Sequence, residues 1–185
     1  MFKAQLDGNP QAADFAGSQF RMNETTAAVA LAQLDRLDWI VERCRGHWQD
    51  LRRRLAAEAP QLKLRHSYDE EGDAGITLYL DLESPARAGR FGEALAAEGI
   101  PLGPSSGMTN LLRHPMIVDR NMPHPALPPF GAVEAAPRND ADSEIANRTD
   151  DILSSMVAIP IGPRYRRADI DDIGSAIVKV VNAHV

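Results

Sequence analysis

The irregular stretch from residue 101 to residue 148 contains most of the side chains that could contact a small molecule. Ser105 and Ser106 lie in a Gly-Pro-Ser-Ser-Gly turn, whose backbone N–H groups can face an anion. A plain turn is the more ordinary interpretation. His114 precedes a proline and is a candidate substrate contact, the alternative being a solvated loop histidine. No Gly-x-x-x-x-Gly-Lys pattern occurs, so a nucleotide phosphate-binding loop is not indicated.

Metal and nucleophile chemistry are weakly supported. His114 and His124 each precede a proline, but zinc needs further ligands and no compact cysteine or carboxylate set supplies them. We therefore predict no metal site. Cys44 lies on an apolar helical stripe, which favours burial over nucleophilic reactivity. A hydrolase built on Ser105 and His114 lacks a Gly-x-Ser-x-Gly elbow.

Two further groups have an ordinary structural interpretation. Arg164, Arg166 and Arg167 surround a tyrosine and could hold a phosphate or carboxylate, although a solvated basic rim is favoured. His47, in a long helical pattern, is expected to be a surface or packing residue.

The elements that position these residues begin with a long helix predicted over 23–58. Asn23 is a plausible N-cap, and Gly46 is a possible point of division into two helices. Such a helix cannot bury its stripe alone, so we expect it to pack on another domain or chain. The apolar side chains that recur at steps of three and four are Ala27, Leu31, Leu34, Leu37, Val41, Cys44, Trp48, Leu51 and Leu55.

Residues 59–185 predict a small α+β domain that contains the irregular loop 101–148. Alternation over 75–82, with Ile76, Leu78, Leu80 and Leu82 on one face, predicts a strand, and a shorter strand is expected at 62–64. Ser84 and Pro85 begin a helix that Gly99 ends. A helix capped at Thr149 or Asp150, a strand over 156–161 and a helix over 169–181 follow. The order favours a small antiparallel sheet with helices packed on one face.

Composition excludes several classes of protein. The 185 residues carry 20 Lys and Arg against 26 Asp and Glu, a net charge of −6, which argues against nucleic acid as a partner. One cysteine excludes an internal disulfide. The sequence shows no apolar run of spanning length and no signal-peptide pattern, so we expect no membrane association and a cytoplasmic location. Residues 1–22 are expected to be irregular.

A motif at the start of the long helix is specific. It resembles the Arg-Met stretch of the DegT/DnrJ/StrS-type aminotransferases, which are fold-type-I enzymes that use pyridoxal 5'-phosphate (PLP) on keto-sugars and cyclitols. Weaker resemblance continues through 86–104 and 149–181, and it corresponds to the carboxyl half of the family's length. The matching residues are Arg21, Met22, Glu24, Ala27, Ala28, Gln33, Leu34, Leu37 and Asp38.

The resemblance implies site residues. Gln19 stands where the family has an asparagine that reaches the PLP phosphate of a dimer partner, and Arg21 matches the motif. Family substrate contacts fall in the loop after the Gly-Ile turn, which here offers Ser105, Ser106, Asn110 and His114. The family's linking helix lies near the dimer interface, and the long helix at 23–58 fits that place.

The family's Schiff-base lysine is not matched. Lys3, Lys63 and Lys179 are the only lysines, and none stands in the family's lysine motif. Since PLP chemistry needs that amine, we predict no catalytic residue in these 185 residues. Two hypotheses follow. The chain is the carboxyl-terminal part of a sugar-type aminotransferase, inactive without an amino-terminal half, or it is a non-catalytic dimerisation module derived from that family.

Overall fold

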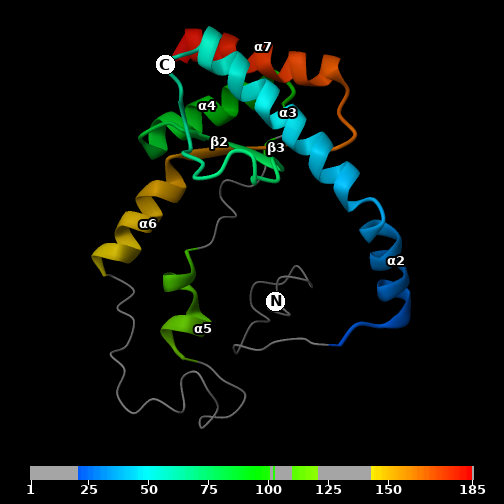
Figure 1. The fold of residues 1–185 in the computed structure, drawn as a ribbon. Coiled ribbons are helices and arrows are strands. Elements are labelled where there is room, and N and C mark those ends of the chain that lie inside the picture. Colours follow the sequence, from blue (N-terminus) through cyan, green and yellow to red (C-terminus); the bar gives the residue numbers. More distant parts are fainter. Residues whose placement is uncertain (1–20, 101, 103–109, 121–142, 185) are drawn as a thin grey trace. The chain divides into compact units, whose positions relative to one another are not determined.

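The computed structural model describes residues 21–100, 102, 110–120 and 143–184 (Figure 1). By their contacts these residues fall into two compact units. The first unit contains the described residues up to 27 and those from 110 to 150, and the second contains 28–100, 102 and 151–184. Helices α2 (Glu24–Leu34) and α6 (Glu144–Ser154) each begin in the first unit and end in the second.

The second unit is an α+β domain, as the sequence predicts. Its sheet has the order β1-β2-β3 and is antiparallel throughout. Leu78 pairs with Ile159 and Leu80 with Val157, so the apolar residues of neighbouring strands lie side by side on one face. The strands are β1 (Lys63–Leu64), β2 (Thr77–Asp81) and β3 (Met156–Pro160), and the helices packed with them are α3 (Leu37–Glu58), α4 (Pro85–Ala97) and α7 (Arg167–His184).

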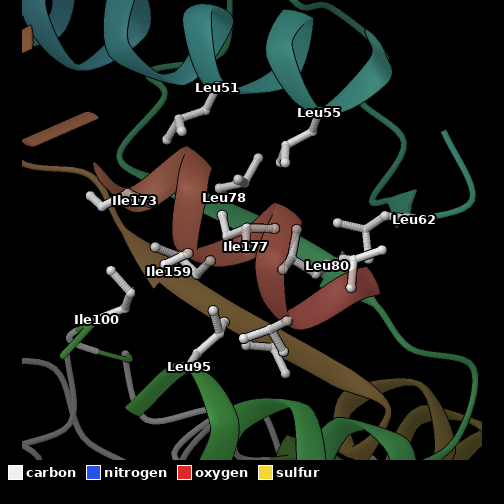
Figure 2. Close-up of a cluster of buried hydrophobic side chains, with 14 of the residues drawn as sticks. Leu51, Leu55, Leu62, Leu78, Leu80, Leu95, Ile100, Ile159, Ile173 and Ile177 are labelled. Atoms are coloured by element: carbon white, nitrogen blue, oxygen red, sulfur yellow. The ribbon is translucent and has the colours of Figure 1, made fainter. Parts of the chain in front are cut away.

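The core of the second unit is made almost entirely of aliphatic side chains. Figure 2 shows residues from β2, β3 and all three helices converging in one cluster. Phe91 on α4 is the largest of its fully buried side chains, and Trp48 on α3 is 2% exposed. Leu51, Leu78, Leu80, Leu95, Ile159 and Ile177 are completely excluded from solvent.

The expected ends of α4 are confirmed. The Ser84 hydroxyl accepts a hydrogen bond from the Arg87 backbone N–H at 3.3 Å, and Pro85 occupies the first helical position. Gly99 follows the helix with a φ of 80°, a left-handed conformation that favours glycine. Phe91 and Leu95 are buried on the inner face of the helix.

The long helix is divided, but not where the sequence suggests. The predicted cap is confirmed, since the Asn23 side chain accepts a hydrogen bond from Thr26 N–H at 2.8 Å. The interruption between α2 and α3 falls at Asp35 and Arg36, whereas Gly46 lies inside α3, so the expected division at Gly46 is wrong. Burial of its neighbours Cys44, His47 and Trp48 outweighs the low helix propensity of one glycine.

Two other boundaries differ from the predictions. Helix α6 begins at Glu144, before both expected caps, Thr149 and Asp150. The Ser143 hydroxyl accepts from Ala146 N–H, while Thr149 donates to the Ile145 carbonyl inside the helix. Ile76 is 59% exposed and precedes the strand, so it does not share the inner face of Leu78, Leu80 and Leu82.

Gly75 explains why the strand begins after Ile76. Its φ is 66°, and a Cβ there would lie 2.7 Å from Arg45 Cα and 2.9 Å from Trp48 Cβ. The chain therefore turns against α3 at a point where only glycine fits.

Candidate functional site

The candidate site residues are described only in part. Gln19, Ser105 and Ser106 lie outside the described residues. Arg21 is exposed and precedes the Asn23 cap of α2. Asn110 and His114 both belong to the first unit, where the short helices η3 (Leu111–Arg113) and α5 (Pro115–Val118) follow one another. The roles expected for these residues stay predictions.

Asn110 is the centre of a polar cluster that joins η3 to α6. It is buried, and its Oδ1 accepts a hydrogen bond from Leu112 N–H at 3.1 Å, which caps η3. Its Nδ2 donates to the Ala146 carbonyl at 2.9 Å and to Asp150 Oδ1 at 2.7 Å. Both amide protons are thus used within the chain, and only an oxygen lone pair is left for a ligand.

Arg113 and Asp150 complete the cluster. Arg113 Nε bonds to Asp150 Oδ2, and a second nitrogen of the guanidinium bonds to Asn147 Oδ1. The hydrogen bond from Asn110, followed by the hydrogen bond and charge of Arg113, holds the pKa of Asp150 below its usual range. Asp150 is therefore a carboxylate at neutral pH, with both oxygens engaged.

Sequence reasoning missed Arg113, Asn147 and Asp150 as one group. Asn147 and Asp150 are three residues apart in α6, a spacing that places both on one helix face. The spacing indicates that the two side chains share a helix face, but it does not indicate that Asn110 and Arg113 pack against that face.

His114 is half-buried at the junction of the two short helices. Its N–H donates to the Leu111 carbonyl at 3.1 Å, and its carbonyl accepts from Ile117 N–H at 2.8 Å. The backbone of His114 therefore ends one helix and begins the next. These hydrogen bonds fix the position of the backbone from which its imidazole extends.

The other chemical candidates have the ordinary roles expected of them. Cys44 is buried with its thiol directed at the Ile161 carbonyl at 3.5 Å, and burial raises its pKa, so a nucleophilic role is not supported. Arg164, Arg166 and Arg167 are exposed, which confirms the solvated rim, and Arg166 pairs with Asp169. Among the described residues no group of histidine, cysteine and carboxylate side chains could hold a metal.

The described lysines do not suit a cofactor linkage. Lys179 binds both oxygens of Glu98 at 2.8 Å, and Lys63 lies 3.7 Å from Glu83 and 3.8 Å from Asp81. Carboxylate partners stabilise a charged ammonium group, whereas a Schiff-base lysine must react as the neutral amine. Neither side chain fits a pyridoxal phosphate site.

Comparison with known families decides the lineage. The DegT/DnrJ/EryC1/StrS aminotransferase family model matches residues 3–117. The chain belongs to this family. The matched region contains the Arg-Met motif, α2, α3, and every candidate site residue. It ends before α6, β3 and α7, so the resemblance expected over 149–181 lies beyond it.

The DegT/DnrJ/EryC1/StrS family has a common general chemistry. Its members are generally dependent on pyridoxal phosphate and usually act as oligomers on small molecules. The cofactor supplies an electron sink for carbanion chemistry. In the described part of this chain, no helix is long and apolar enough to cross a membrane.

Proposed function

We propose that these 185 residues are the small-domain part of a PLP-dependent aminotransferase that acts on a keto-sugar or cyclitol. The amine that holds the cofactor comes from a lysine-bearing amino-terminal half. Family membership supports the transaminase assignment, and the engagement of Lys63 and Lys179 with carboxylates supports the dependence on another half. A cytoplasmic location goes with this proposal.

One observation carries the need for a partner: α2 is apolar, yet it buries none of its residues. Leu31 is 65% exposed, Leu34 61% and Val29 58%. In a helix Val29 faces away from Leu31 and Leu34, so apolar side chains occupy opposite sides. A helix that is apolar all round is normally buried, and here its cover must come from outside the described residues.

The apolar surface continues past the interruption into the first turn of α3. Leu37 is 47% exposed and Trp39 43%. Farther along, α3 turns its buried side to the core of its own unit. The docking surface is therefore α2 together with the start of α3, the segment that follows Arg21 and Met22 of the family's motif.

The test mixes the full chain with the lysine-bearing amino-terminal half of a family aminotransferase and PLP. We expect a complex by light scattering, a visible absorbance band of lysine-bound cofactor, and amino transfer to a keto-sugar. Leu31→Asp should weaken association about tenfold or more, because it places a charge in an apolar interface. Ile76→Asp is the matched control, since Ile76 is 59% exposed but lies outside α2. Failure to associate with any such half would contradict the proposal.

A second candidate function rests on the same helix. If α2 pairs with α2 of another copy, the chain is a non-catalytic dimerisation module. That alternative predicts a dimer of the isolated chain that Leu31→Asp dissociates, together with no gain of activity from any lysine-bearing half.

A further inference from the structure

A groove of about 510 Å³ lies between α3 and α7, entirely within the second unit. It contains Arg167, one of the arginines that the sequence offers as a possible carboxylate contact, but none of the site residues that the family resemblance implies. The side chains that matter to its chemistry are Glu42, Arg43, His47, Arg167 and Asp171, with Gly46 in its wall.

Gly46 keeps this wall of the groove open. It lies in the middle of α3, where glycine destabilises a helix relative to alanine. A Cβ at this position would have no atom within 4 Å, so no close packing demands a glycine there. The structural effect of Gly46 is therefore space in the groove.

His47 presents an unsatisfied acceptor at the same place. Only 7% of the residue is exposed, and its Nε2 has no hydrogen-bond partner among the described residues. Burial, followed by the positive charge of Arg43, lowers the pKa of His47. A hydrogen bond with the Tyr165 backbone and the negative charge of Asp50 act in the opposite direction but are smaller. A neutral imidazole keeps one nitrogen as an acceptor. His47 lines the groove.

The groove also contains charges of both signs that lack an opposite partner in the described part of the chain. Arg167 is exposed, and its side chain makes no ion pair there; the same is true of Glu42. Arg43 bonds to the carbonyl oxygens of Pro163 and Tyr165, which do not neutralise its charge.

The carboxylate of Asp171 completes the set, because only the backbone oxygen of this residue is used, by Arg54 and Ser175. The remaining charges of the groove are already paired, Arg53 with Asp50 and Arg54 with Glu58.

We propose that the groove between α3 and α7 binds a small zwitterion of the α-amino acid class. Its carboxylate pairs with Arg167, and its ammonium group pairs with Glu42 and donates to His47 Nε2. A simple anion would meet unpaired carboxylates, and a simple cation would meet unpaired guanidinium groups. A molecule with both charges meets a partner for each. Leu51 and Ile170 supply apolar surface for its side chain.

The experiment adds the probe L-leucine to the full 185-residue chain without cofactor. Binding is followed by the NMR signals of the His47 ring and by calorimetry. Two probes each remove one charge: 4-methylpentanoate lacks the ammonium group and 3-methylbutylamine lacks the carboxylate. We expect saturable binding of leucine and at least about tenfold weaker binding of either half-molecule, since a hydrogen bond to a charged group contributes about that factor.

Variants locate the site. Arg167→Gln and Glu42→Gln should each weaken leucine binding about tenfold. Gly46→Leu should abolish it by filling the groove. Gly89→Leu is the control, because Gly89 lies in α4 and a Cβ there also meets open space. If Gly46→Leu fails to fold, the two exposed-residue variants decide the question.

Three results would overturn the proposal. The first is absence of saturable leucine binding to the unmodified chain. The second is unchanged affinity in a folded Gly46→Leu or Arg167→Gln variant. The third is binding of 4-methylpentanoate as tight as that of leucine, which would make the ligand a simple anion. None of these readouts depends on transamination, so they are independent of the proposed function.

Discussion

Single side chains in this protein act mostly through hydrogen bonds that connect segments far apart in the sequence. Asn110 reaches residues 36 and 40 positions later, and Arg43 reaches carbonyls 120 and 122 positions later. In the described residues, both side-chain amide protons of Asn110 are hydrogen-bonded, whereas His47 keeps an unpaired nitrogen. That contrast separates a side chain that holds the fold from one that can accept a ligand.

The stability of the first unit should depend on pH through Asp150. Its folded pKa is lowered, so its contribution is complete above the unfolded aspartate pKa of about 3.9 and is lost as the pH falls through the folded value. An NMR titration should show the Asn110 side-chain amide shifting with the Asp150 carboxyl below that pH. Asp150→Asn should remove the transition. Titration of Asp150 at or above the ordinary value would contradict the cluster.

At the scale of elements, α2 and α3 differ although they are neighbours in one apolar pattern. Both have leucines at helical spacing, but only α3 packs leucines on the core, namely Leu51 and Leu55. Apolar spacing predicts which side of a helix needs cover, and not whether the cover comes from the same chain.

Matched substitutions should reveal this difference. Leu51→Ala in α3 is expected to cost about 2–5 kcal/mol of unfolding free energy, because Leu51 is fully buried and the change leaves a cavity. Leu31→Ala in α2 should change it by less than about 0.5 kcal/mol in the isolated chain. Urea unfolding of the two variants makes the comparison. Equal costs would mean that α2 is packed in the free chain.

On the scale of the whole molecule, the second unit has its own core and the apolar surface of α2 lies outside it. Association should therefore change α2 far more than it changes the sheet. We expect backbone amides of α2 to gain protection from hydrogen exchange when the lysine-bearing half binds, while β2 and β3 stay as protected as before. The melting temperature should rise with partner concentration. The free energy of unfolding should increase by about 2.7 kcal/mol when the partner is present at one hundred times the Kd. Protection spread evenly over the sheet would point to a different interface.

The sequence by itself determined the family, the α+β class, the caps at Asn23 and Ser84, and the inner face of β2. These features depend on residues close together in the chain. Their spacing indicates which side of a helix or strand is apolar, and their types indicate where a helix begins. Tertiary structure alone decided that the long helix breaks at Asp35 rather than Gly46, that Ile76 faces solvent, and that Asn110 meets Asp150. At Gly46 and at Asn110 the physical reason is that burial and pairing with distant segments outweigh local preferences of a fraction of a kcal/mol to about 1 kcal/mol.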